Sequence, residues 1–389
     1  MTQTSPRARV PRAITPPLPI MYLHLQSTID DAQRAGVDAA ALQLGVRLVA
    51  PESGAQLLEG AQLLEIVSAG VPVPERGQVV SAFTVLPGVI EVLDRPGEQP
   101  LWSATRRPST VVEVAGAVFG GGRASIIAGP CAVEDGGELL EIARAVQSRG
   151  ATLLRGGAFK PRSSPYSFQG LGQRGLQHLK DVRESTGLGI VTEVLDPREI
   201  ESVLEVADMV QVGARNMANS SLLKELGTVD RPVLLKRGFG ATVDEFLNAA
   251  EYLLCAGNTR VVLCERGVRS FDQVTRNLLD VGAIAHLRGA THLPIIADPS
   301  HAAGRSDLVR AIGRAGMAAG ADGLMVEVHL DPSAALSDGQ QAIGPDELEA
   351  LVADAGVLCE LDGRTLLTGD HQTQHPSLPK IPTHLRGTA

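Results

Sequence analysis

The feature that most constrains the fold is a repeat of short apolar, β-branched segments between residues 125 and 328. Most of them are separated by an amphipathic helical segment such as GGELLEIARAVQSRG. The eight segments are SIIAGP, ATLLRG, GIVTEV, MVQVGA, PVLLKR, RVVLCER, PIIADP and GLMVEV. Eight buried strands that alternate with helices predict a (β/α)8 barrel, a member of the α/β class. A doubly wound open sheet is the structural alternative, but it normally uses fewer strands.

Charged or metal-binding residues stand at the C-terminal ends of these segments. The positions are Cys131, Arg155, Glu193, Arg215, Lys236, Arg266, His301 and Glu327. The opposite ends carry mostly Ser, Gly, Ala, Met and Pro. In a barrel the C-terminal strand ends and the loops after them build the active site. Scattered surface charges would explain a few of these positions but not the whole ring, so we predict a site at this end.

Cys131 follows a buried segment in the stretch IIAGPCAVED. A free cysteine often packs as a small hydrophobic residue, and each of its possible partners is by itself more often structural. The partners are His301 and Glu327 at two other strand ends and Asp338 in LSDGQQ. Thiolate, imidazole and carboxylates together suit Mn²⁺, Zn²⁺, Fe²⁺ or Co²⁺ better than Mg²⁺ or Ca²⁺. We therefore predict a divalent metal site on this face.

A cluster of cations shares the same barrel end. Arg155, Lys160 and Arg162 lie within LLRGGAFKPRSSPY, and further cations end other strands at Arg215, Lys236 and Arg266. The formal net charge of the chain is -9, so no basic surface is available for a nucleic-acid backbone. An acidic protein that gathers cations at one mouth is suited to bind a multiply charged anion such as a phosphate. Ser163 and Ser164 add hydroxyl donors beside Arg162.

The four cysteines show no CxxC spacing, which favours a reducing compartment over a disulfide framework. No uncharged apolar run reaches roughly 18 residues, and the first 19 residues lack the apolar core of a signal peptide. We expect a cytoplasmic protein that binds neither membrane nor nucleic acid.

Several stretches together resemble the 3-deoxy-D-arabino-heptulosonate 7-phosphate (DAHP) synthases of the class I beta type. They are AGPCAVE, LRGGAFKPRSSPYSFQGLG, VGARNM, PVLLKRG, LCERGVRSFDQVTRNLLD, ADPSHAAGR, GADGLMVEVHLDP and ALSDGQQ, between Ser125 and Leu348. The resemblance implies a metal-dependent transferase that condenses phosphoenolpyruvate with erythrose 4-phosphate, the first step of the shikimate pathway and of aromatic amino acid biosynthesis. It also implies a homo-oligomer, a tetramer or a dimer.

The resemblance assigns roles to residues of this chain. The implied metal ligands are Cys131, His301, Glu327 and Asp338. The implied phosphoenolpyruvate site is formed by Arg155, Lys160, Arg215, Lys236 and Arg266, with His301 close by. The implied erythrose 4-phosphate segment is Lys160, Pro161, Arg162 and Ser163. Of these, Lys160 and His301 are the predicted catalytic residues, with Lys160 as the general acid for the new hydroxyl because neighbouring cations favour a lowered pKa.

Two alternative functions remain at this point. A 3-deoxy-D-manno-octulosonate 8-phosphate synthase would condense the same enolpyruvate with a five-carbon sugar phosphate, but the run KPRSSPY disfavours it. A non-catalytic regulatory subunit would keep the fold and lose the chemistry, and the intact set of ligands and cations argues against it.

The remainder of the chain predicts three further regions. Residues 1–19 are a disordered leader, and residues 20–107 form a βαββαβ, ferredoxin-like (ACT-like) domain and a linker. A β-hairpin opens the catalytic region, residues 108–357, and residues 358–389 form a polar tail. Some enzymes of the resembling group carry a ferredoxin-like module that binds an aromatic amino acid. The small domain is therefore expected to be regulatory, with tyrosine or phenylalanine as the effector, although a role in assembly alone is the alternative.

Overall fold

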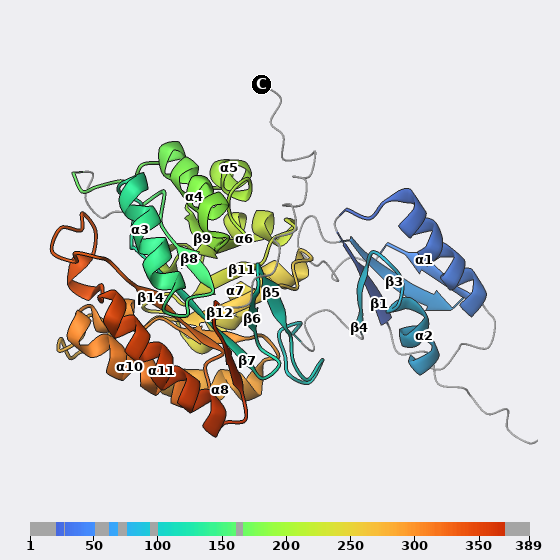
Figure 1. Ribbon diagram of the computed structural model, residues 1–389. Coiled ribbons are helices and arrows are strands. Elements are labelled where there is room, and N and C mark those ends of the chain that lie inside the picture. The colour runs from blue at the N-terminus through green and yellow to red at the C-terminus, as the bar shows by residue number, and fades with distance from the viewer. Residues whose placement is uncertain are drawn as a thin grey trace, which may run out of the picture. The chain divides into compact units, whose positions relative to one another are not determined.

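The computed structural model describes residues 21–26, 28–50, 62–68, 76–93, 100–160 and 166–369, and these fall into two compact units (Figure 1). The smaller unit belongs to the first 98 residues and the larger unit begins at Gln99. The predicted disordered leader, residues 1–19, lies outside the described residues. Each unit is described by itself below.

The smaller unit is a four-stranded antiparallel sheet with two helices. Its elements are β1 (Met21–Leu25), α1 (Asp31–Leu44), β2 (Val46–Val49), β3 (Gln62–Ser68), α2 (Arg76–Phe83) and β4 (Val89–Leu93). The strand order is β2-β3-β1-β4, with β1 between β3 and β4. The predicted βαββαβ order and ferredoxin-like arrangement are therefore confirmed.

Helix α1 shows how local sequence fixes this unit. Asp30 caps the helix, because its side chain accepts the Gln33 amide while the Gln33 side chain accepts the Asp30 amide. The helix ends at Gly45, whose φ of 67° is the left-handed conformation that glycine adopts without steric cost. Its buried residues, Val37 and Ala41, pack into one apolar core with β1 and α2.

The larger unit is a closed parallel barrel. Its strands are β7 (Arg123–Gly129), β8 (Leu153–Arg155), β9 (Gly189–Val194), β10 (Met209–Val212), β11 (Val233–Lys236), β12 (Val261–Glu265), β13 (Ile295–Ala297) and β14 (Gly323–Glu327). Neighbours in this order are hydrogen-bonded, and β14 pairs with β7 to close the barrel. Helices surround the strands, as Figure 1 shows. The predicted (β/α)8 barrel is confirmed, and its eight strands coincide with the eight apolar segments.

The helices of the barrel follow their strands in chain order. They are α3 (Gly136–Gln147), α4 (Gln173–Thr186), α5 (Ile200–Leu204), α6 (Ser220–Gly227), α7 (Val243–Cys255), α8 (Val281–Ala290), α10 (Ser306–Ala318) and α11 (Pro345–Leu361), with the short α9 (Pro299–Ala303) directly after β13. Among the described residues, no helix is both long and apolar enough to span a lipid bilayer.

A β-hairpin covers the N-terminal ends of the barrel strands. It consists of β5 (Val112–Val114) and β6 (Ala117–Phe119), and its turn at Ala115 and Gly116 has positive φ at both residues. The three glycines at residues 120–122 connect the hairpin to β7. The hairpin shares one apolar core with inward-facing residues of the barrel, including Leu153 and Met325. The polar end of the barrel is therefore the end that remains available for a ligand.

The boundary predicted for the polar tail needs correction. Helix α11 continues to Leu361, and β15 (Thr365–Leu367) pairs in parallel with the first residues of β7. The segment is ordered because β7 begins before its neighbour β8 and offers an unpaired edge to a short apolar strand. Only residues 370–389 of the predicted tail lie outside the described residues.

Candidate active site

A cavity of about 310 Å³ opens at the C-terminal end of the barrel strands. All described residues of the predicted site except Glu327 line it: Cys131, Arg155, Lys160, Arg215, Lys236, Arg266, His301 and Asp338. Glu327 lies behind the cavity wall as the fully buried last residue of β14. The strand-end rule therefore located the cavity correctly. The predicted residues Pro161, Arg162 and Ser163 lie outside the described residues.

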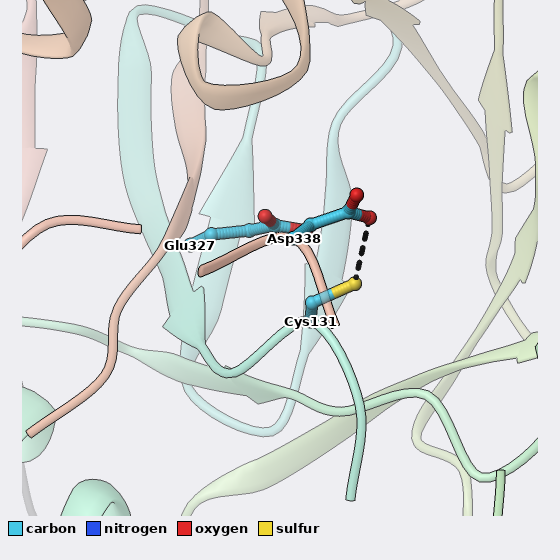
Figure 2. Close-up of side chains that lie close together, drawn as sticks. All are labelled: Cys131, Glu327 and Asp338. Carbon is cyan, nitrogen blue, oxygen red and sulfur yellow. Dashed lines mark hydrogen bonds between the residues drawn. The ribbon is translucent and has the colours of Figure 1, made fainter. Parts of the chain in front are cut away.

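Three of the four predicted metal ligands form one compact group. Cys131 follows β7, Glu327 ends β14, and Asp338 lies on the loop after β14 (Figure 2). One donor atom from each of the three lies within 4.8 Å of the other two. The Cys131 thiol donates a hydrogen bond to Oδ2 of Asp338 over 3.2 Å. This spacing of sulfur and oxygen donors is compatible with a single ion between them.

His301, the fourth predicted ligand, lies beside this group on α9. Its Nε2 is 3.3 Å from Oε1 of Glu327, although it is not within 4.8 Å of all three donor atoms. Burial lowers the pKa of His301 to about 4 even though Asp298 opposes the shift. The imidazole is therefore neutral at physiological pH, which is the form that can bind a metal.

Asp298 connects the predicted metal site to the predicted anion site. It is fully buried directly after β13, and its carboxylate contacts both the Lys236 ammonium and, at 2.7 Å, Nδ1 of His301. It also accepts the backbone amide of His301 at 3.0 Å, which caps α9. Burial alone would raise the pKa of Asp298, but His301 and Lys236 hold it well below its usual value. The ionised carboxylate fixes the ring so that Nε2 points toward Glu327.

The residues of this group fit a divalent cation. Glu327 Oε1 is buried and accepts no hydrogen bond of good geometry among the described residues, although Arg155 Nη2 lies 3.1 Å away. Burial, and then the charge of Glu327, raise the pKa of the Cys131 thiol to about 11. A cation between these groups would satisfy the orphaned oxygen and would stabilise the thiolate.

Four of the predicted cations are buried around the same cavity. Arg155, Lys160, Lys236 and Arg266 are each less than 9% exposed. Nε and Nη1 of Arg155 have no hydrogen-bond partner among the described residues, and burial lowers the pKa of Arg266. Lys160 donates to the backbone oxygen of Cys131, and its Nζ lies 3.2 Å from the Cys131 sulfur. Buried cations with open donors are arranged to bind an anion.

Several residues of the site were not predicted. Ser167, Gln211 and Arg276 line the cavity, and Asp298 lies behind it. Asp298 directly follows β13, so the strand-end rule applied literally would have found it. Gln211 lies inside an apolar segment and donates to Glu193 over 3.2 Å. Ser167 and Arg276 lie within long loops, where sequence position gives no sign of the cavity.

A second group of possible ligands, Glu134, Glu138 and His329, lies near the loop that carries Asp338. Both oxygens of Glu134 accept the backbone amide of Leu336, at 2.9 and 3.0 Å. His329 accepts the Asp331 amide at Nδ1 and places Nε2 3.4 Å from Glu138. These contacts account for the group as support for the loop, so it needs no ion.

Comparisons with known proteins identify the family to which the barrel region belongs. The model of the DAHP synthetase I family matches residues 109–361. A phospho-2-dehydro-3-deoxyheptonate aldolase of Thermotoga maritima is 47% identical over 254 residues, which cover 65% of this chain and 75% of that protein. A 2-dehydro-3-deoxyphosphooctonate aldolase of Nitratidesulfovibrio vulgaris is 33% identical, over 62% of this chain and 93% of that protein.

Solved structures show the same similarity. The crystal structure of the Thermotoga maritima phospho-2-dehydro-3-deoxyheptonate aldolase (DAHP synthase) covers 89% of this chain and 99% of its own, with a TM-score of 0.67 and 38% identity. A truncated form of the 3-deoxy-D-arabino-heptulosonate 7-phosphate synthase from the same organism covers 68% of this chain and 98% of its own, with a TM-score of 0.64 and 42% identity.

Proposed function

This chain belongs to the DAHP synthetase I family, and we propose that the residues around its barrel cavity carry out the family's condensation. The protein is a 3-deoxy-7-phosphoheptulonate synthase, a transferase that joins phosphoenolpyruvate to erythrose 4-phosphate and releases phosphate. The residue assignment rests on one observation. Four buried cations lie around the same cavity as a thiol and two carboxylates.

Cys131, His301, Glu327 and Asp338 are the residues that would hold a divalent ion, with Mn²⁺, Zn²⁺, Fe²⁺ and Co²⁺ as the candidates. When bound, the ion supplies a Lewis acid that polarises the aldehyde oxygen of the sugar phosphate. The protein orients the ligands through its own contacts. Asp298 sets the orientation of the His301 ring, and Arg155 contacts the Glu327 carboxylate.

Arg155, Arg215, Lys236 and Arg266 bind the phosphate and carboxylate of phosphoenolpyruvate. The C3 carbon of phosphoenolpyruvate attacks the aldehyde carbon and forms the new carbon–carbon bond, and water adds to C2. Cleavage of the bond between C2 and the phosphate oxygen then releases phosphate and leaves the water oxygen as the C2 ketone, and the cations stabilise the charge of the leaving group. The unpartnered Nε and Nη1 of Arg155 are the donors best placed for this task. Of the two protons that the water loses, one goes to the departing phosphate and the other restores the ammonium of Lys160.

Lys160 donates the proton to the alkoxide that becomes the new hydroxyl. Its ammonium lies beside Cys131, so it would be in reach of a sugar aldehyde bound next to that residue. Lys160 also begins the segment with Pro161, Arg162 and Ser163 that we assign to erythrose 4-phosphate. The Arg guanidinium and the Ser hydroxyl are suited to the sugar phosphate group.

Turnover with each sugar phosphate tests this function. Phosphate release from phosphoenolpyruvate should require erythrose 4-phosphate and should stop when a chelator removes divalent ions. Equal turnover with a five-carbon aldose phosphate would instead favour the octulosonate chemistry of the more distant relatives. No turnover with either sugar would support a non-catalytic subunit.

For the smaller unit we propose a regulatory role. Its ferredoxin-like sheet suits a binding module for tyrosine or phenylalanine, formed between neighbouring subunits of a homo-oligomer, a dimer or tetramer. The effector would act by binding the inhibited arrangement more tightly, and a bias of ~2 to 3 kcal/mol suffices for strong inhibition.

Truncation tests the regulatory role. A chain that begins at Pro108 should keep turnover and lose inhibition. The solved structure of a truncated relative, which matches 68% of this chain, supports the choice of a shortened chain. Full-length enzyme whose turnover is unchanged by millimolar tyrosine, phenylalanine and tryptophan would rule the effector out.

We also infer a cytoplasmic location from the four cysteines, all of which are free thiols and suit a reducing compartment.

A further inference from the structure

One short segment that contains no proposed metal ligand contacts two of the four proposed ligands, His301 and Asp338, and reaches a third, Glu327, through Gln341. The segment consists of Arg276 and Asn277, on the loop between β12 and α8. The backbone of both residues is hydrogen-bonded to α9. We infer that Arg276, Asn277 and the buried Gln341 are positioning residues that set the geometry of the metal site. This inference rests on the proposed function of the site, because it takes the ligand set as given.

The first contact fixes the helix that carries His301. The Arg276 amide donates to the Ala303 carbonyl at 3.0 Å, and the Asn277 amide donates to the Ala302 carbonyl at 2.9 Å. The Asn277 side chain also donates to the carbonyl of His301 at 3.0 Å. Three hydrogen bonds therefore hold a five-residue helix that is too short to be stable by itself.

The close approach of this segment depends on glycine. Gly304 ends α9 with a φ of 68°, and a Cβ atom at this position would lie 2.3 Å from Cβ of Arg276. No side chain fits in that space, and the left-handed backbone also disfavours one. The segment and the helix end are thus built to lie in direct contact.

The second contact reaches Glu327 through Gln341. Gln341 is fully buried, and its Nε2 donates to Oε2 of Glu327 at 2.7 Å. Its Oε1 accepts from Nη1 of Arg276 at 3.0 Å. The amide therefore has only one orientation that satisfies both neighbours, since Glu327 needs a donor and Arg276 needs an acceptor. That orientation occupies Oε2 of Glu327 and leaves Oε1 for the metal site.

The third contact is electrostatic and reaches Asp338. Nη1 of Arg276 lies 3.6 Å from Oδ1 of Asp338, while Oδ2 faces the Cys131 sulfur. Asp338 has a φ of 54°, which lies in the left-handed region of backbone conformation. This conformation is unusual and strained for a residue other than glycine. An attractive charge on one oxygen helps to hold the residue in this conformation with the other oxygen directed at the site.

Metal binding by the full-length chain tests the inference, with Co²⁺ alone as the probe. The Gln341→Met variant keeps the side-chain volume but removes both hydrogen bonds, and we expect Co²⁺ affinity to fall about 10- to 100-fold in a competition titration with a chelating dye. The absorption bands of bound Co²⁺ should also shift, because the coordination geometry changes. Arg276→Met should weaken binding about 10-fold, and Arg276→Lys should restore part of the loss.

The double variant and a matched control sharpen the test. Because Arg276 acts partly through Gln341, the double Arg276→Met, Gln341→Met variant should lose less than the product of the two single losses. Gln177 makes the same amide-to-carboxylate hydrogen bond to Asp181 at 2.7 Å, but on the exposed face of α4. Gln177→Met should leave Co²⁺ affinity and spectrum unchanged.

The outcomes separate this inference from the proposed function. Co²⁺ affinity within two-fold of wild type in folded Gln341→Met would overturn the positioning role while leaving the site intact. If that variant does not fold, Arg276→Met decides, because the Arg276 side chain is 38% exposed and its loss is easily tolerated. A wild-type chain that binds no Co²⁺ would overturn the metal site, and the positioning role with it.

Discussion

The two units of this chain bury very different side chains. In the described part of the smaller unit, the buried residues are apolar or aromatic apart from His24. The barrel buries both positive and negative groups at the end where its strands terminate, among them Arg155, Lys236, Asp298 and Glu327. Burial of an ionised group costs free energy unless a partner or a ligand compensates for it. The comparison indicates that the barrel sequence is constrained by chemistry and the smaller unit mainly by packing.

A second comparison, within the barrel, separates buried cations that support the structure from those that serve the site. Each guanidinium nitrogen of Arg231 donates to a backbone carbonyl, to Ala207, Asp230 or Leu204. Arg155 is equally buried, yet its Nε and Nη1 have no hydrogen-bond partner among the described residues. A structural arginine is satisfied by the fold, whereas a ligand-binding arginine keeps donors for the ligand.

The largest expected effect comes from Cys131→Ala. If Cys131 is a metal ligand, turnover should fall more than about 1,000-fold and bound metal should be lost, while the fold remains. Cys359→Ala is the matched control, since Cys359 is a fully buried cysteine on α11 away from the cavity. It should cost only about 1 kcal/mol of stability. Full activity of Cys131→Ala in chelator-treated buffer would contradict the metal site.

The next effect separates the two kinds of buried arginine. Arg155→Met should lower kcat/KM for phosphoenolpyruvate about 100-fold, because charge-assisted hydrogen bonds to the substrate are lost. Arg231→Met should instead reduce the free energy of unfolding by about 2 to 4 kcal/mol and leave KM unchanged in the folded fraction. Steady-state kinetics and urea titrations on both variants measure the difference. Equal kinetic losses would show that the distinction between the two arginines is unfounded.

The ionisation of Asp322, which directly precedes β14, is expected to have a smaller effect on stability and little effect on turnover. Burial raises the pKa of Asp322 to about 6, although the Ile295 amide, at 3.0 Å, opposes the shift. The folded protein then binds a proton more tightly than the unfolded chain, so stability falls as pH rises from about 4 to about 6. Above that range the ionised carboxylate costs about 2 to 3 kcal/mol.

Asp322→Asn tests this pH dependence. The amide oxygen can still accept the Ile295 amide, so the variant should be more stable than wild type at pH 8 and nearly equal at pH 4. Thermal unfolding at both pH values measures the change. A stability difference that does not vary with pH would mean that Asp322 does not titrate in this range.

The sequence predicted the barrel and the cavity well for a physical reason. A charged residue at the end of an apolar segment, such as Arg155 in β8 or Lys236 in β11, is placed by the strand itself. Residues placed by tertiary contacts could not be found in this way. Arg276 and Gln341 lie 65 positions apart, and only the folded loops bring them to 3.0 Å. The order of β15 likewise depends on the free edge of β7.

The smallest effect on turnover is expected when the core of the smaller unit is damaged. Phe83 ends α2, is fully buried, and packs in the apolar core with β1 and α1. Phe83→Ala removes a large side chain from a small core and should cost about 3 to 5 kcal/mol, which is comparable to the whole stability of a domain of this size. Limited proteolysis should therefore cut the smaller unit readily, while turnover without effector stays within two-fold of wild type. A fall of ten-fold or more in kcat, with the barrel still resistant to proteolysis, would show that the smaller unit contributes to the chemistry, and the division of labour between the two units would have to be abandoned.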